Sequence, residues 1–152
     1  MNASSPLDTL LNLAREARDH AGQHLAGNLG VEQQVRQQLE SLESYRQEYA
    51  SRLSEAMRQG VDPATLHNTQ RFLASLDQAL ANAHHALAEQ RQKVQQAQRQ
   101  WQQEQQRVCA YDTLAERRAA VATRHASRHE QRTTDDLVNS RLQRQRALPG
   151  AD

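Results

Sequence analysis

The hydrophobic residues in the middle of the chain recur every seventh position. The line consists of Leu66, Leu73, Leu80, Leu87, Val94, Trp101 and Val108. A straight helix drifts about 20° per heptad away from such a line, so the pattern predicts a left-handed coiled coil against a partner helix. The positions three residues further on are mixed and include Leu76, Gln90 and Tyr111. We therefore expect the seam between the helices to be narrow.

A second helical pattern of apolar residues runs from Leu7 to Ala56. Ser5, Pro6 and Asp8 indicate its start, because a serine caps the helix, proline suits the first turn and an acidic residue three positions on completes a capping box. This helix should therefore begin close to Ser5.

Three glycines, Gly22, Gly27 and Gly30, interrupt the middle of this pattern, and Asn28 falls on its apolar line. Each glycine costs about 1 kcal/mol relative to alanine in a helix, although packing can override the loss. We expect one continuous helix with a weak middle.

The two patterns meet at Gly60, Asp62 and Pro63, which indicate a helix end, an N-cap and a new first turn. So short a connection permits only antiparallel packing. The predicted fold is all-α, with a second helix that is longer and overhangs the first. It forms a single coiled-coil domain over 1–152, with helix one about 5–58, a turn about 59–62, helix two about 63–147 and a disordered C-terminal tail.

The overhang should begin near residues 115–120, because the seam positions become polar there. These positions are Arg118, His125, His129, Arg132 and Asp136. A helix without a partner along this length would need one from another protein.

The composition agrees with elongated helices and excludes a compact globule. Hydrophobic residues make up 37% and aromatic residues 3%, and the mean hydropathy is −0.95. The formal net charge of +1 argues against a general polycation. No apolar run approaches the roughly 20 residues of a membrane span. With no secretory signal pattern either, we expect a cytoplasmic protein whose membrane association is peripheral.

Candidate chemistry is sparse. The chain has no phosphate-binding glycine loop and no CxxC pair, so we expect neither an enzyme nor a bound cofactor. The i, i+4 pairs His20/His24 and His125/His129 each lack a third ligand, which favours solvated histidines over a metal site. The one cysteine, Cys109, excludes an intramolecular disulfide and, beside Val108, is expected to be an inert, partly buried thiol.

The C-terminal segment is locally basic. It contains Arg117, Arg118, Arg124, Arg128, Arg132, Arg141, Arg144 and Arg146 against Glu130, Asp135 and Asp136. Such a stripe suits an acidic protein groove, anionic lipid or nucleic-acid phosphate, and it is equally typical of a solvated helical tail. The segment lacks aromatic residues for base stacking, which counts against specific single-strand binding.

Aromatic residues gather near the predicted turn. Phe72, Leu76, Ala79 and Ala83 follow one another at steps of four, three and four, beside the leucine line. Reflection about the turn sets the segment from Tyr45 to Tyr49 opposite residues 73–77. The residues could simply widen the core. A two-helix hairpin has only one interior seam, however, so a second stripe stays partly exposed and favours a docking patch.

Several of these segments resemble the flagellar type III export protein FliJ family. They are Leu7, Leu10, Leu13 and Ala14, the segment from Gln38 to Tyr49, Phe72 and Leu73 with Leu76, Asp77 and Ala79, and Trp101. The resemblance covers nearly the whole chain. It implies a cytoplasmic export component similar to the central stalk subunit of rotary ATPases, peripherally associated with the inner face of the cell membrane.

The resemblance also implies partners. These are the flagellar export ATPase hexamer and its regulator, the membrane export-gate protein, and export chaperones, for which such a protein acts as an escort factor. No specific nucleic acid and no cofactor are implied. The alternatives are the stalk protein of a virulence type III secretion system, and a coiled coil that binds an anionic surface through its basic C-terminal helix.

The resemblance finally implies two sets of site residues. The gate-docking positions would be Gln38, Leu42, Tyr45, Tyr49, Phe72, Leu76 and Ala79, with His84, or less closely His85, as the family histidine. The contact with the ATPase ring would use both chain ends, through Leu7, Leu10, Arg117, Arg118, Arg124, Arg128 and Arg132.

Overall fold

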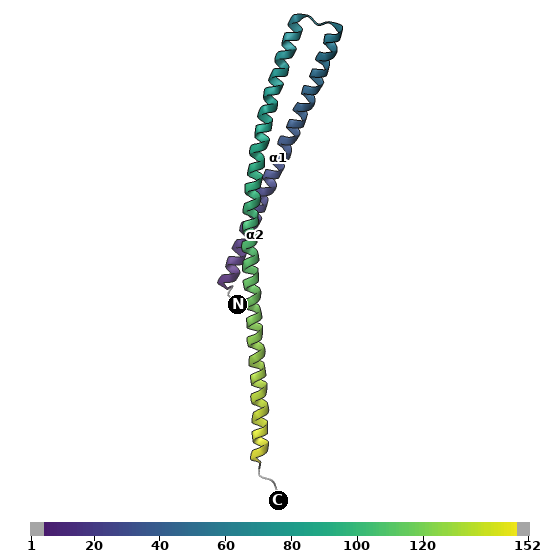
Figure 1. Ribbon diagram of the computed structural model, residues 1–152. Coiled ribbons are helices and arrows are strands. Elements are labelled where there is room, and N and C mark those ends of the chain that lie inside the picture. The colour runs from purple at the N-terminus through teal and green to yellow at the C-terminus, as the bar shows by residue number, and fades with distance from the viewer. Residues whose placement is uncertain (1–4, 149–152) are drawn as a thin grey trace. The chain divides into compact units, whose positions relative to one another are not determined.

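The computed structural model describes residues 5–148, which form two long helices joined by a short turn (Figure 1). Helix α1 is Pro6–Gln59, with 54 residues, and helix α2 is Pro63–Ala147, with 85 residues. The helices pack against each other as a hairpin, and the second is the longer one. The predicted fold class is therefore confirmed.

A reciprocal capping box begins α1. The backbone N–H of Asp8 donates to Ser5 Oγ (3.2 Å), and the backbone N–H of Ser5 donates to Asp8 Oδ2 (3.0 Å). Two of the N–H groups that a helix start leaves without partners are satisfied in this way. The pattern of serine, proline and aspartate predicted this start.

The turn between the helices depends on Gly60 and Asp62. Gly60 adopts a φ of +91°, in the left-handed region where a side chain would be strained. Asp62 Oδ2 accepts a hydrogen bond from the backbone N–H of Thr65 at 3.3 Å and so caps α2. Hydrogen bonds from Thr65 lower the pKa of the Asp62 carboxyl below its usual value.

Residues 15–106 form one compact unit, in which α1 packs on α2 along the seam. Shielded positions alternate at steps of three and four on both helices, as a heptad pattern requires. Of the leucine line, Leu66, Leu73, Leu80 and Trp101 are half-buried. The buried residues of this unit are Ala21, Leu39, Leu87, Gln90, Val94 and Ala97.

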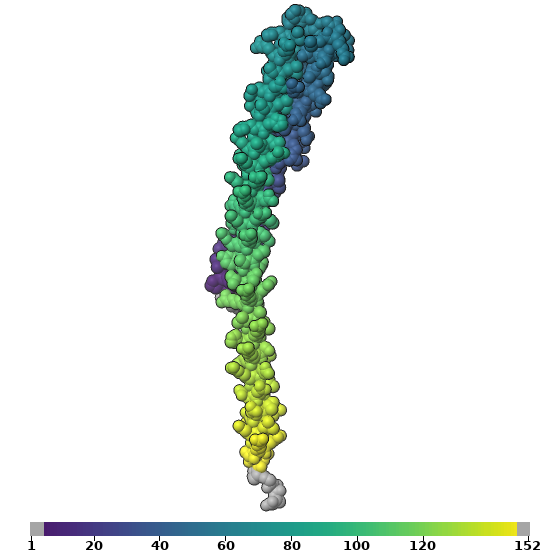
Figure 2. All heavy atoms as spheres, viewed as in Figure 1, coloured from purple at the N-terminus to yellow at the C-terminus, as the bar shows by residue number. Residues whose placement is uncertain are grey.

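The other unit contains the described residues up to Ala14 and those from Arg107 onward. Leu11, Ala14 and Val108 form its hydrophobic cluster, and Tyr111 packs against them. Ala115 is the last half-buried residue of α2, and every described residue after it is exposed. Figure 2 shows the yellow part of α2 as a single column of atoms. The end of shielding thus falls where the overhang was expected to begin. The predicted disordered tail lies almost wholly outside the described residues.

The glycine-containing middle of α1 is continuous helix, as predicted. Its polar seam residue Asn28 meets Gln90 of α2, which is only 7% exposed. Gln90 Nε2 donates to the backbone oxygen of Asn28 at 3.0 Å and to its Oδ1 at 3.1 Å. The buried amide of Gln90 is therefore satisfied, and this pair fits only one alignment of the two helices.

The expectation for Cys109 was wrong. Its side chain is exposed, because the residue after the seam residue Val108 points away from α1.

Candidate functional site

Two flanks border the seam in the unit of residues 15–106, and they differ in chemistry. Each residue of the aromatic flank stands one position before a seam residue. The pairs are Gln38 before Leu39, Tyr45 before Arg46, Arg52 before Leu53, Phe72 before Leu73, Ala79 before Leu80 and Ala86 before Leu87. The charged flank lies on the other side of the seam and consists of Glu43, Ala50, Asp77, His84 and Arg91. In an antiparallel pair, equivalent heptad positions of the two helices share a flank. A groove shared by Ala17, His24 and Gln100, which occupy equivalent positions, agrees with this assignment.

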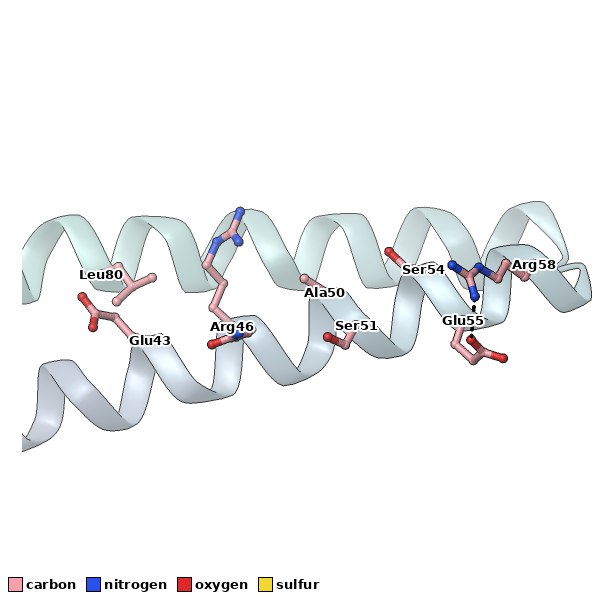
Figure 3. A pocket seen from close by; sticks show the side chains of 9 residues that line it. Glu43, Arg46, Ala50, Ser51, Ser54, Glu55, Arg58 and Leu80 are labelled. Atoms are coloured by element: carbon pink, nitrogen blue, oxygen red, sulfur yellow. Dashed lines mark ion pairs between the residues drawn. The ribbon is translucent and has the colours of Figure 1, made fainter.

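Ion pairs between the helices occupy the charged flank. Arg46 binds Asp77, Glu43 Oε1 lies 3.6 Å from His84 Nε2, and Arg91 Nε lies 3.6 Å from Oε1 of the seam residue Glu32. The hydrogen bond to Asp77 raises the pKa of Arg46. Figure 3 shows Arg46 and Glu43 of α1 beside Leu80 of α2 on this flank. The flank therefore aligns the two helices.

The aromatic flank carries exposed hydrophobic rings instead. The rings of Tyr49 and Phe72 lie 4.6 Å apart between centroids and are tilted by 59°. Phe72 is 43% exposed and Tyr45 is 56% exposed. The guanidinium of Arg52 lies 5.6 Å from the centroid of the Tyr49 ring, in cation–π range. Ordered aromatic rings that remain exposed are typical of a protein interaction site.

A shallow groove adjoins Tyr45 on α1. It is lined by Gln34, Gln37, Gln38, Ser41, Leu42 and Tyr45. Amide and hydroxyl groups border an apolar floor in this groove, which suits a polypeptide partner better than a small charged molecule.

Seven of the eight expected gate-docking residues lie on the seam or on the aromatic flank. Leu42, Tyr49 and Leu76 are half-buried seam residues, whereas Gln38, Tyr45 and Phe72 are exposed and Ala79 is half-buried. The predicted second stripe is thus only partly separate, because Leu76 and Ala83 belong to the seam itself.

The histidine expected in this patch lies elsewhere. His84 faces Glu43 on the charged flank, and His85 Nε2 lies 3.1 Å from Glu89 Oε1 on the same helix. The structure does not bring either histidine to Tyr45 or Phe72.

Sequence reasoning missed Arg52 and Ala86, which belong to the aromatic flank, and Val31, which extends it. Val31 precedes the seam residue Glu32, and Ala86 precedes Leu87, so both continue the line of Tyr45 and Ala79. Val31 is an exposed large hydrophobic residue. A heptad assignment on both helices, rather than on one, would have found them.

The residues expected at the ATPase ring fall into two groups. Leu7 is half-buried in the seam, and Leu10 is exposed beside it. All five arginines of the group are exposed on α2. Within residues 5–148, no ion pair joins any arginine between 117 and 146 to a carboxylate. Ion pairs do form at the earlier arginines Arg18, Arg36, Arg46, Arg52, Arg58 and Arg91.

Residues 5–148 contain no group of three or more His, Cys, Asp or Glu side chains arranged to hold a metal ion. Neither α1 nor α2 has a stretch apolar enough, at sufficient length, to cross a bilayer.

These features define an antiparallel coiled-coil protein whose candidate sites are exposed surfaces on helix flanks. The family described as "Flagellar FliJ protein" matches residues 3–147. The chain therefore belongs to the FliJ family, whose members are non-enzymatic components of the flagellar export apparatus.

Two relatives carry the same description, "Flagellar FliJ protein". The protein from Salmonella typhi is 32% identical over 132 residues, covering 87% of this chain and 90% of the relative. The protein from Escherichia coli K12 is 30% identical over 132 residues, with the same coverage. The similarity thus includes both helices.

Proposed function

We propose that the chain acts as a stalk and adaptor between the export ATPase ring and the membrane export gate, and as an escort factor for export chaperones. One observation carries this proposal. The aromatic flank keeps Tyr45 and Phe72 exposed near the turn, while the far part of α2 stays single and basic. A protein with two chemically different surfaces on separate parts of one hairpin suits the bridging of two partners.

The gate partner would bind the aromatic flank near the turn. Its contacts would come from Gln38, Leu42, Tyr45, Tyr49, Phe72, Leu76 and Ala79. His84 remains in this set only if binding separates it from Glu43, to which it is now close. A partner that covers Tyr45 and Phe72 gains apolar burial, worth about 25 cal/mol per Å² before the costs of association.

The ATPase ring would bind the two chain ends. The expected contacts are Leu7, Leu10, Arg117, Arg118, Arg124, Arg128 and Arg132. The regulator of the ATPase and the chaperones would meet the protein in this assembly. The protein would then be cytoplasmic and held at the inner face of the cell membrane only through its partners. Family membership favours the flagellar apparatus over a virulence secretion system.

A matched pair of double variants tests the docking patch. Tyr45→Ala with Phe72→Ala removes exposed apolar side chains from the aromatic flank. Leu29→Ala with Met57→Ala removes exposed apolar side chains of α1 outside that flank. Binding to the cytoplasmic part of the gate protein from the same bacterium should weaken about 10-fold or more for the first variant only, as expected when an aromatic anchor is lost.

Thermal unfolding of both variants supplies the control. Similar melting temperatures with selective loss of gate binding support the patch. Equal binding by both variants, or a large drop in melting temperature for the first alone, would refute it. Swimming in soft agar should follow the binding result.

A further inference from the structure

One stripe on the exposed part of α2 combines hydrophobic and basic side chains and begins beside the end of the seam. Steps of three and four alternate along Leu114, Arg117, Val121, Arg124 and Arg128. Residues with this spacing lie along one face of a helix. The stripe starts one position before Ala115, the last shielded residue, so it lies beside the seam and not on it. We call these five residues the mixed stripe.

The hydrophobic members of the mixed stripe are exposed. Leu114 is 49% exposed and Val121 is 53% exposed. Continuing at the same spacing, the line passes Gln131 and Asp135 and reaches Val138 and Leu142, which are also exposed large hydrophobic residues. Four of the six exposed large hydrophobic side chains from Leu114 onward therefore share one face, an arrangement that a solvated tail does not require.

Leu10 extends this surface onto α1 within the same unit. It immediately precedes the seam residue Leu11, as Leu114 immediately precedes Ala115. Equivalent heptad positions of an antiparallel pair share a flank, so Leu10 lies on the same side of the seam as Leu114. Leu10 is exposed as well.

The charge of this segment is opposite to that of the remaining chain. Residues 116–148 hold eight arginines and four carboxylates, a net charge of +4, which leaves −3 for the rest of a chain whose total is +1. Among the described residues, Arg117, Arg124 and Arg128 form no ion pair. Guanidinium groups placed this way are available for carboxylates of a partner.

We propose that the mixed stripe, with Leu10, is the face of this chain that docks on an acidic protein surface with apolar pockets. This inference rests on the proposed function, under which that surface belongs to the interior of the export ATPase ring. The stripe contributes most of the contact with the partner, and Arg141 and Arg144 stay in solvent.

The spacing disfavours the other anionic partners. A helix lying on a membrane has a broad apolar face with basic residues at its edges. Here arginines and apolar residues alternate along one line, so inserting Val121 into lipid would draw Arg117 and Arg124 in with it. Nucleic-acid phosphates would pair with the arginines but leave Leu114 and Val121 without an apolar contact.

Two matched charge reversals in the full chain test the proposal. Arg124→Glu with Arg128→Glu changes the stripe, whereas Arg141→Glu with Arg144→Glu makes the same change in net charge off the stripe. Binding to the purified export ATPase of the same bacterium is measured between about 50 and 300 mM salt, a range over which screening changes strongly. The stripe variant should bind about 10-fold or more weakly at the lowest salt, and the control within about twofold of the wild type.

A second pair tests the apolar part. Val121→Ser should weaken binding to a similar extent at low and high salt, because the lost contact is not ionic. Leu137→Ser, at a residue that is 61% exposed but off the stripe, should leave binding unchanged. Circular dichroism checks that all four variants keep the helicity of the wild type.

The outcomes separate this inference from the proposed function. If the wild-type chain does not bind the ATPase, the proposed function fails. If it binds but both charge reversals weaken binding equally, or neither does, the stripe is wrong while the stalk role stands. Binding of the wild type to vesicles of anionic phospholipid or to duplex DNA, in place of the ATPase, would overturn both.

Discussion

The indole of Trp101 packs against Gly22, where no side chain separates the two helices. A Cβ atom at Gly22 would lie 3.3 Å from both Cδ1 and Nε1 of the indole, closer than ordinary van der Waals contact. The glycine that weakens α1 locally thus makes room for the largest side chain on the seam.

Gly22 and Gly27 should respond differently to alanine. Gly27 has nothing within 4 Å of a Cβ, so Gly27→Ala should stabilise the protein by about 0.5 to 1 kcal/mol through helix propensity. Gly22→Ala gains the same propensity but must displace Trp101, and we expect it to be at least about 1 kcal/mol less stable than Gly27→Ala. Urea unfolding measures both. Equal stabilisation would show that the indole moves at no cost.

The polar pair of Asn28 and Gln90 on the seam should lower the stability of the protein but specify one alignment of the two helices. Replacing both partners, Asn28→Leu with Gln90→Leu, removes a buried amide and adds apolar contact, so the melting temperature should rise. Without the pair, other alignments and other oligomers become accessible, because a single buried polar residue can determine both in coiled coils. Analytical ultracentrifugation should then detect self-association. A strictly monomeric variant with unchanged stability would contradict this prediction.

Substitutions of Tyr45 and Tyr49 should differ in their effect on the free energy of unfolding. Tyr49 is half-buried and packs on Phe72, so Tyr49→Ala should lower the free energy of unfolding by about 1 to 2 kcal/mol, less than a fully buried aromatic. Tyr45 is exposed, and Tyr45→Ala should change the free energy of unfolding by less than about 0.5 kcal/mol. Chemical unfolding of both variants checks this. Similar losses would mean that Tyr45 belongs to the core.

The cap at Asp62 should make the hairpin sensitive to acid. The pKa of Asp62 is lower in the folded protein than the value of about 3.9 expected in the unfolded chain. The carboxylate therefore contributes fully to folding stability at pH values above the unfolded-state pKa, and this contribution disappears as the pH falls through the folded-state pKa. Asp62→Asn keeps a capping oxygen without a charge. Its melting temperature should therefore fall less steeply than that of the wild type below about pH 4. Parallel curves would exclude Asp62 as a source of acid sensitivity.

Removing the single-helix part of α2 should leave the hairpin intact. A chain that ends after Glu116 keeps every shielded residue of the seam, and its melting temperature should stay within a few degrees, about 4 °C or less. The helical circular dichroism signal should drop in proportion to the residues removed. A large fall in melting temperature would show that residues 117–148 support the hairpin.

Much of the fold follows from the sequence because its signals are repeated many times. The heptads on both helices, the capping residues at Ser5 and Asp62 and the glycine at Gly60 all predict one hairpin. Where shielding ends on α2 was also foreseeable, since the seam positions become polar after Ala115. Single residues that face away from the seam were harder to assess, as Cys109 shows.

The candidate site was less accessible to sequence reasoning. The position that continues the steps of four, three and four after Phe72 is Ala83, not His84. One residue along a helix turns a side chain by about 100°, and this shift carries His84 to the charged flank beside Glu43. The chemical contrast between the flanks needs both helices in alignment, and one helical pattern alone does not supply that alignment.

The short turn at Gly60 also has a consequence for how the chain folds. Partners near the turn, such as Arg46 and Asp77, are 31 residues apart, whereas Arg18 and Gln105 are 87 residues apart. Since the entropy of loop closure grows with this separation, pairing should begin at the turn and spread outward. During synthesis, α1 leaves the ribosome long before the residues that cover Ala21 are made, and its apolar face must remain soluble until then.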